Sequence, residues 1–373
     1  MKQFFRVKYL VVSVAMLLLG CTDPVEPEYS YVEGLIYIDA QISTSVGTSY
    51  AKIYESNTDF RLYRNIFQPG AAVVFRNVDT NGAITLSEGE DVYVPPEDFR
   101  ANNGETWQLE ITLEDGRQYR SQPETVNAPI PFQEINAEYR KELLYREDVE
   151  EFVPGHSITI SLNDPAETAN HYLWGYRSFE RPRFCQVCYN SVFRNGECVS
   201  SETFNDPYYT YGCETSDCFQ IRYHEKIELL SDEFVDGLTV NNLEVAQVPL
   251  YTNADILVEV QQFSISPNAY EYYKVLKDIV DNNSGFNAPP PAALIGNLVS
   301  LNSDDEFVLG RFTAVASSTQ SIFIARGDIV ESPIEPILPA NYEMVSGPGS
   351  ATTTAPCTES RYRTAMEPDG WVD

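Results

Sequence analysis

Apolar and polar residues alternate with a two-residue period along much of this chain, which is the pattern of half-buried β-strands. Residues 31–40, 104–113, 157–162 and 258–263 show it most clearly. Asn81-Gly82 and Asp115-Gly116 lie between such runs and favour tight turns, because these residue types accept positive φ angles. The pattern therefore predicts a mainly β chain.

Strand spacing and turns divide the chain into regions. Short strands without helices over residues 31–130 predict an immunoglobulin-like β-sandwich. The Ala128-Pro129-Ile130-Pro131 stretch marks the expected boundary, and residues 131–330 are expected to form a second β-rich domain with one helix and a disulfide-stapled insertion. Residues 331–373, rich in Pro, Ser, Thr and Gly, are expected to form an irregular C-terminal tail.

One helix interrupts the β pattern. Ser266 is suited to cap it and Pro267 to occupy its first turn. Its apolar positions recur with helical spacing and share a face: Tyr272, Tyr273, Leu276, Ile279 and Val280. The tyrosines could line a binding groove, but this spacing favours packing against the core.

The N-terminus has the features of a lipoprotein signal peptide. Residues 1–20 combine three basic residues with an apolar run too short to span a bilayer. Leu18-Leu19-Gly20-Cys21 fits a lipobox, which predicts cleavage before Cys21 and lipidation of its thiol. Residues 21–30 are acidic, contain prolines and predict an extended tether. An ordinary signal peptide with an incidental cysteine is the alternative.

Composition excludes one class of partner. The chain carries 55 acidic and 25 basic residues, a net charge of −30. Such a surface repels nucleic acid, so we expect no nucleic-acid partner. A self-repelling, soluble exterior explains the acidity more simply than an acid-specific function.

Six cysteines remain besides Cys21, and an even number outside the cytoplasm indicates disulfides. They are Cys185, Cys188, Cys198, Cys213, Cys218 and Cys357. The Cys185-x-x-Cys188 spacing also suits a zinc site closed by Cys213 and Cys218. An oxidising compartment favours disulfides, with the cluster stapling one long loop and Cys357 tying the tail back to it.

Aromatic residues crowd the same loop and are the candidate contact surface for a partner, because aromatics carry much of the binding energy at interfaces. The candidates are Phe184, Tyr189, Phe193, Tyr208, Tyr209 and Tyr211. Packing of these rings against the disulfides is the alternative, and the sequence does not separate the two.

The segment from Asn77 to Glu88 has the oxygen-ligand spacing of a calcium-binding EF-hand loop. Its flanks are strand-like, whereas an EF-hand needs helices on both sides. A β-hairpin with a solvated turn is therefore the preferred interpretation, with weak calcium binding left open. No metal or cofactor is otherwise expected.

Catalytic motifs have little support. The three histidines, His156, His171 and His224, form no known metal or nucleophile motif. We therefore expect no enzyme activity. Arg326-Gly327-Asp328 matches a tripeptide that some adhesive proteins present, but a three-residue sequence often occurs by chance. It therefore carries little weight.

Several stretches together resemble one family. They are SLNDPAETANHYLWGY, SDEFVDG, FSISPNAYEYYKVLKDIVDNNSGFNAPPPAALIGNLVS, VLGRFTAVA and CTESRYRTAMEPDGW. In order and over nearly the whole chain after residue 20, they resemble the Bacteroidota lipoproteins classed as domain of unknown function 4249. That resemblance implies an outer-membrane accessory protein, since members are often encoded beside TonB-dependent transporters.

The leading hypothesis is a non-enzymatic lipoprotein, anchored in the outer membrane and exposed at the cell surface. It would dock on a TonB-dependent outer-membrane receptor and help to capture its substrate. A structural or adhesive surface lipoprotein without a transporter partner is the alternative. A hydrolase with an unfamiliar metal site is a third hypothesis, which tightly bound zinc would support.

Overall fold

The computed structural model describes residues 32–59, 62–146, 150–182, 185–200, 208–212, 218–224, 226–281, 296–334 and 357–372. Within these residues the chain is mainly β and contains one α-helix, as the alternation predicted. None of the described helices combines the length and the apolar composition needed to cross a membrane. Cys21 and the tether lie outside the described residues, so lipidation stays a prediction.

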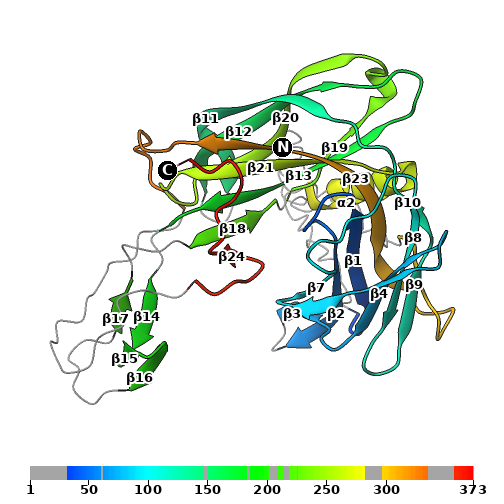
Figure 1. Ribbon diagram of the computed structural model, residues 1–373, viewed down its shortest axis with the longest axis horizontal. Helices are drawn as coiled ribbons and strands as arrows, with labels where there is room; N and C mark the ends of the chain where they lie inside the picture. The colour runs from blue at the N-terminus through cyan, green and yellow to red at the C-terminus, as the bar shows by residue number, and fades with distance from the viewer. Residues whose placement is uncertain are drawn as a thin grey trace, which may run out of the picture.

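An eleven-stranded sheet, called the long sheet below, runs through the molecule (Figure 1). Its main path is β24-β18-β13-β21-β23-β1-β2-β7-β6, and β19 and β3 pair at the side with β13 and β2. Its strands are β1 (Ile36–Ser43), β2 (Tyr50–Asp59), β3 (Leu62–Phe67), β6 (Ser87–Gly89), β7 (Val92–Val94), β13 (His171–Glu180), β18 (Phe219–Tyr223), β19 (Glu228–Ser231), β21 (Ile256–Ser264), β23 (Val308–Ile324) and β24 (Arg363–Thr364).

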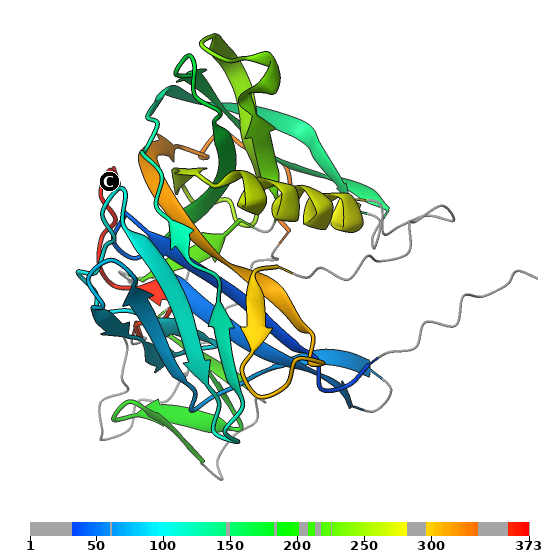
Figure 2. The same ribbon diagram turned by 90° about the vertical axis from the view of Figure 1, so that its right-hand side faces the viewer.

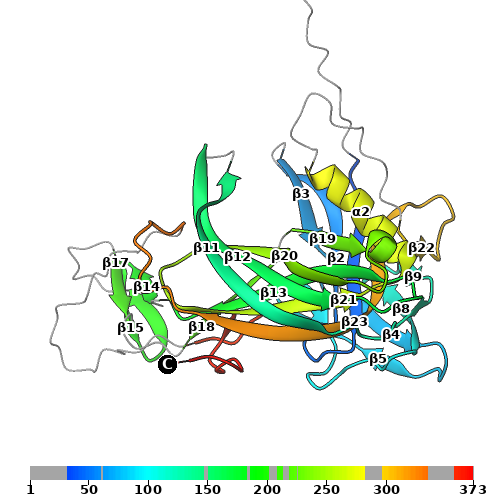
Figure 3. The ribbon, with the colours of Figure 1, turned by 90° about the horizontal axis from the view of Figure 1, so that it is seen from above.

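Two smaller sheets accompany the long sheet. A six-stranded sheet contains β4 (Ala72–Asn77), β5 (Ala83–Thr85), β8 (Thr106–Thr112), β9 (Gln118–Ser121), β10 (Glu124–Thr125) and β22 (Leu298–Ser300). A three-stranded sheet contains β11 (Phe132–Arg146), β12 (Glu151–Asn163) and β20 (Thr239–Pro249). Figure 3 shows the long, curved β11 and β12 on one side of the molecule and β4, β8 and β9 on the other.

Both smaller sheets pack on the same face of the long sheet. Even-numbered residues of β1 and β23, such as Ile38 and Phe312, enter the core shared with the six-stranded sheet. Even-numbered residues of β13 and β21, such as Trp174 and Val258, enter the core shared with the three-stranded sheet. The registers keep these positions on one face, because successive side chains of a strand alternate. The result is a sandwich-like arrangement with one continuous layer.

Strand pairing crosses the expected boundary near residue 130. Strand β1 pairs in parallel with β23, from Ile36 opposite Val308 to Ser43 opposite Val315. Strand β22 likewise extends the six-stranded sheet through β9. Residues 31–130 therefore do not form a self-contained sandwich, and their two layers are completed by chain from residues 298–316. The spacing of local turns carries no information about such distant pairing.

Two glycines permit the close approach of these segments. Gly310 has a φ of +96°, and a Cβ there would lie 1.9 Å from the carbonyl oxygen of Ile38 on β1. A Cβ on Gly296 would lie 1.9 Å from the carbonyl oxygen of Gly310 itself. Any larger residue at either position would collide with backbone, so glycine is what lets β1, β23 and the segment preceding β22 pack together.

Helix α2 (Pro267–Asp281) begins as the sequence predicted. The Ser266 hydroxyl accepts a hydrogen bond from the backbone N–H of Ala269 at 3.2 Å, and Pro267 is the first helical residue. The helix packs on the face of the long sheet opposite the two cores, against Phe263 and Val315. Figure 2 shows it, in yellow, between the part of the molecule that holds β11 and the part that holds β1.

The insertion after β13 contains two small hairpin-like sheets. Strand β14 (Gln186–Tyr189) pairs with β17 (Tyr208–Tyr211), and β15 (Ser191–Arg194) pairs with β16 (Glu197–Ser200). Figures 1 and 3 both place these strands at one end of the molecule, away from β1 and β4. A short 3-10 helix, η1 (Asp232–Phe234), follows β19.

Candidate functional site

A cavity of about 1070 Å³ lies on the face of the long sheet opposite the two cores, beside helix α2. Strands β1, β2 and β7 form one end of its floor, and β13, β18 and β21 form the other. Helix α2 and the C-terminal segment 358–361 supply its walls. We call this cavity the groove. The residues on which its chemistry depends are Tyr37, Asp39, Tyr50, Lys52, Tyr273 and Arg361.

Alternation along β1 and β2 builds the floor of the groove. Ile36, Ile38, Ala40 and Ile42 enter the core, so Tyr37, Asp39 and Gln41 point the opposite way. Antiparallel pairing places Asp39 opposite Lys52, and Gln41 opposite Tyr50. The floor is thus a ladder of aromatic and charged side chains, directly behind an apolar core.

The carboxylate of Asp39 is held by one hydroxyl group. Tyr50 Oη donates towards both carboxylate oxygens, at 3.2 Å from each. Burial raises the pKa of Asp39, and the nearby charges of Lys52 and Arg361 only partly offset this effect. Burial and the charge of Asp39 together raise the pKa of Tyr50 well above its usual value, so its hydroxyl remains a donor at neutral pH.

Lys52 is the least satisfied charge in the groove. Its ammonium makes no hydrogen bond and no ion pair with any residue that the structure describes, and it lies 5.4 Å from the centre of the Tyr50 ring. Burial lowers the pKa of Lys52, and the positive charge of Arg361 lowers it further, while Asp39 acts in the opposite direction. Lys52 on the floor and Arg361 on the wall therefore place two positive charges in one part of the groove.

Arg361 reaches the groove from the C-terminal segment. Its guanidinium lies 4.5 Å from the centre of the Tyr223 ring and 5.8 Å from that of Tyr50. These distances are typical of cation–π contacts. The Tyr223 hydroxyl also donates to the Arg361 carbonyl at 3.0 Å. Within the described residues the guanidinium forms no ion pair with a carboxylate.

A disulfide holds this segment in place. Cys218 and Cys357 are joined, with their Cα atoms 5.3 Å apart, and strand β24 then pairs with β18. Trp371 adds an apolar contact by packing edge-on against Phe219 and Phe323. The expectation that Cys357 ties the tail to the cysteine cluster is confirmed. The expected irregular tail, in contrast, includes an ordered segment that forms one wall of the groove.

The opposite wall comes from helix α2. Tyr273 shares a hydrogen bond with Thr313 of β23 at 3.1 Å, and Leu276 and Val280 continue the wall. The preference for core packing at these helix positions is therefore only partly right. Tyr273 packs against the sheet and also lines the groove, whereas Val280 is 60% exposed.

Further along the floor, Arg177 is fixed by Glu259 through two hydrogen bonds of 2.6 and 3.0 Å. His224 packs its ring on Tyr176 with the ring centres 4.8 Å apart. Burial lowers the pKa of His224 to about 4, so its imidazole is neutral at pH 7. Lys226, which also lines this half, is exposed and donates to Gln247 Oε1 at 2.7 Å. The partly buried cation that has no carboxylate partner among the described residues is therefore at the Lys52 end of the floor.

The aromatic candidates of the insertion have different surroundings. Phe193, Tyr209 and Tyr211 are buried in a small cluster with Cys188, so these rings pack around a disulfide and do not form an exposed contact surface. Tyr189, by contrast, is 72% exposed, and Tyr208 is half-buried beside it. Phe184 lies outside the described residues. Contact with a partner stays a prediction for Tyr189 and Tyr208.

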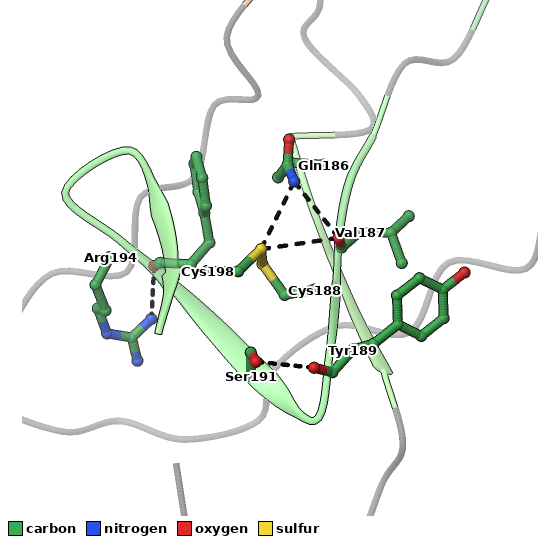
Figure 4. The surroundings of a disulfide bond; sticks show 8 residues. Gln186, Val187, Cys188, Tyr189, Ser191, Arg194 and Cys198 are labelled. Carbon is green, nitrogen blue, oxygen red and sulfur yellow. Dashed lines mark hydrogen bonds between the residues drawn. A yellow bond between two sulfur atoms is a disulfide. The ribbon is translucent and has the colours of Figure 1, made fainter. Parts of the chain in front are cut away.

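Figure 4 shows the disulfide at the centre of this insertion. Cys188 and Cys198 are joined, and Gln186 Nε2 lies 3.6 Å from Cys198 Sγ. The Tyr189 side chain points away from it. Cys185 is also disulfide-bonded, and Cys213 lies outside the described residues. The cysteines thus form disulfides, as predicted, and Cys185 and Cys188 are not free thiolates for a zinc ion.

The EF-hand-like segment forms a hairpin. Asn77 Oδ1 accepts backbone hydrogen bonds from Asp79 and Thr80 at 3.0 and 2.9 Å, and Asn81 has a φ of +63°. Asp79 Oδ2 accepts from the backbone N–H of Thr106. Strands β4 and β5 flank the turn, so the preferred interpretation is confirmed.

Two other charged motifs serve the architecture. Carboxylate oxygens of Asp164, Asp232 and Asp236 lie within 4.8 Å of one another, and each accepts a hydrogen bond from a neighbouring backbone N–H. This cluster joins the loop after β12 to the loop around η1. Arg326 is 1% exposed and ion-paired with Glu180, so the Arg326-Gly327-Asp328 tripeptide is not presented for adhesion.

Sequence reasoning did not single out Asp39, Lys52 or Arg361. The available signal was the polar half of an alternating strand, Tyr37-x-Asp39-x-Gln41, which a two-layer sandwich would leave facing solvent. That face becomes a groove because α2 and the C-terminal segment pack beside it and form its walls. Nothing local in the sequence indicates that segments about 230 and 320 residues away cover it.

Fold and groove together define the class of the molecule: a mainly β, sandwich-like protein with disulfides and an aromatic groove on one sheet face. The chain belongs to the family described as Domain of unknown function (DUF4249), whose model matches residues 22–321. The match confirms the family resemblance and covers most strands of both cores. No curated protein and no solved structure matches the chain.

Proposed function

We propose that the protein is a lipid-anchored, non-enzymatic capture protein of the outer membrane. It binds a ligand in the groove and passes it to a TonB-dependent transporter. The groove is the observation that carries this proposal. Its volume of about 1070 Å³ lies just above the range of ordinary ligand sites. Its walls combine aromatic rings with a few fixed polar groups, as ligand sites generally do.

Two further features support the location and the partner. The Leu18-Leu19-Gly20-Cys21 motif predicts an acyl anchor, and the acidic tether that follows would keep the folded body near the membrane. The family resemblance implies a setting beside TonB-dependent transporters. Tyr189 and Tyr208, at the far end of the insertion, supply exposed aromatic surface of the type that anchors protein interfaces.

The decisive experiment is affinity purification of the tagged, lipidated protein from gently solubilised outer membranes. We expect a near-stoichiometric TonB-dependent barrel in the eluate. A Tyr189→Ser/Tyr208→Ser variant should lose it. Tyr145→Ser is the matched control, because Tyr145 is also an exposed tyrosine but lies on β11, away from the insertion. Recovery of the lipoprotein alone, even after crosslinking, would instead favour the structural or adhesive role.

A further inference from the structure

The groove contains two partly buried cations that form no ion pair with a described carboxylate. The chain has more than twice as many acidic as basic residues, and many of its exposed cations pair with a carboxylate. Arg76, Arg117, Arg140, Arg177 and Lys277 all form ion pairs, although each is partly exposed to solvent. Lys52 and Arg361 do not, although they line a concave, partly buried site.

Neighbouring groups position these two cations without neutralising them. Tyr50 lies beneath both, at 5.4 Å from the Lys52 ammonium and 5.8 Å from the Arg361 guanidinium. The ring contacts favour a positive charge but leave the N–H donors of both side chains available. Asp39 lies opposite Lys52 in the strand register, but the two side chains form no ion pair.

Other carboxylates of the groove do not fill this role. Glu359 accepts a hydrogen bond from the backbone N–H of Ala365 at 2.6 Å, and Glu259 is engaged by Arg177. Glu90 and Glu97 line the β7 end of the groove and make no ion pair with Lys52 or Arg361. Two like charges held close together are unfavourable unless an anion joins them.

We propose that Lys52 and Arg361 form a subsite for the anionic group of an organic ligand, whose ring-shaped body stacks on the tyrosines of the groove. An ammonium and a guanidinium are suited to a carboxylate, sulfonate or phosphate, to which both donate charge-assisted hydrogen bonds. Tyr37, Tyr223 and Tyr273 provide the aromatic faces beside that subsite. The inference names the ligand class for the proposed function and therefore rests on it.

The subsite is completed by a segment from the other end of the chain. Lys52 belongs to β2, whereas Arg361 is brought to the groove by the Cys218–Cys357 disulfide and by pairing of β24 with β18. Anion binding should therefore need both the sheet and the covalent attachment of the C-terminal segment. Reduction of that disulfide offers a second route to the same loss of binding.

The test uses two fluorescent probes of the same shape. One is 8-anilinonaphthalene-1-sulfonate, a ring-bearing anion, and the other is N-phenyl-1-naphthylamine, its neutral counterpart. We expect the folded protein to bind the sulfonate more tightly, with an affinity that falls as salt is raised. Lys52→Met and Arg361→Met should each weaken sulfonate binding by about tenfold and leave binding of the neutral probe unchanged.

Controls separate charge from folding. Lys52→Arg keeps the charge and should retain sulfonate binding, whereas Lys141→Met removes a lysine paired with Glu331 on β11 and should change nothing. Each variant should keep the circular dichroism and melting temperature of the parent. Equal affinity for the two probes, unaffected by Lys52→Met, would overturn the anion subsite while leaving a ligand-binding groove intact. Binding of neither probe would contradict both this inference and the proposed capture function.

Discussion

The two faces of strand β1 have opposite surroundings. On one face Ile36, Ile38, Ala40 and Ile42 are at most 1% exposed and pack into the core with the six-stranded sheet. On the other, Tyr37, Asp39 and Gln41 look into the groove. One strand thus supplies stability through one row of side chains and recognition chemistry through the other.

This division separates two quantities that mutations usually change together. Replacing a core residue removes apolar contacts and leaves a cavity, so its cost appears in the free energy of unfolding. Replacing a groove residue removes a polar group that has few partners to lose, so its cost should appear in binding. Substitutions on neighbouring positions of β1 and its partner strands can test how sharp the division is.

The largest effect is expected where β1 and β23 approach each other. Gly310→Ala places a methyl group against the carbonyl of Ile38 in a backbone conformation that disfavours alanine. We expect a loss of at least about 4 kcal/mol in the free energy of unfolding, or no soluble folded protein. Gly327→Ala is the control, since nothing lies within 4 Å of the added Cβ. Equal urea midpoints for the two variants would contradict the close packing of Gly310 against the Ile38 carbonyl.

A smaller but clear contrast is expected between the two faces themselves. Phe312 is fully buried in the core beside Phe75, so Phe312→Ala should lower the free energy of unfolding by about 3–5 kcal/mol. Tyr37→Phe removes only a hydroxyl on the groove face, and this hydroxyl makes no hydrogen bond with a described residue. This substitution should change the free energy of unfolding by less than about 0.5 kcal/mol. Chemical denaturation measures both. A cost above 2 kcal/mol for Tyr37→Phe would mean that the groove face also carries the fold.

The smallest effect per buried residue is expected from a change of pH. Burial lowers the pKa of both His156 and His224 to about 4, with Arg326 adding to the effect at His156. Between pH 7 and pH 5 these imidazoles become protonated in the unfolded chain but stay neutral in the folded one. The free energy of unfolding therefore falls as the pH drops from 7 towards 5. We expect about 2 kcal/mol for each histidine over this interval.

Buried carboxylates also contribute to the pH dependence of stability, but they contribute equally in the parent and in a variant that lacks the two histidines. Burial raises the pKa of Glu124 and Asp39, which opposes the histidines because the folded protein then holds those protons more tightly. Unfolding of a His156→Gln/His224→Gln variant should therefore be compared with that of the parent at pH 7 and at pH 5. The variant should show a weaker loss on acidification. If both proteins lose the same free energy of unfolding between pH 7 and pH 5, the histidines do not cause the loss.

Local patterns predicted much of this molecule. The strands around residues 106, 158 and 258, the hairpin at Asn81 and the Ser266-capped helix all depend on neighbours within a few residues, which the sequence displays directly. The disulfides were predicted from the number of cysteines, and the link from Cys357 to the cluster was expected. The segments that match the family include those in which Gly296 and Gly310 permit close packing.

Long-range features were not predicted. The pairing of β1 with β23 depends on complementary strand edges about 270 residues apart, and no local signal marks it. The groove needs the same pairing, as well as α2 and Arg361, so its residues were missed. The insertion was predicted only in part: the sequence located its aromatics but did not tell Phe193, buried against the disulfide, from Tyr189, which is exposed.

The parallel pairing of β1 with β23 also orders the events by which the molecule is made. Strand β1 emerges from the ribosome long before residues 308–324 have been synthesised, so at first it lacks its parallel partner β23. The six-stranded sheet is delayed in the same way by β22. The chain therefore passes through synthesis, and through any transport that follows, as an incomplete sheet. The two layers close only after β22 and β23 have been synthesised, so the N-terminal half cannot complete its fold by itself.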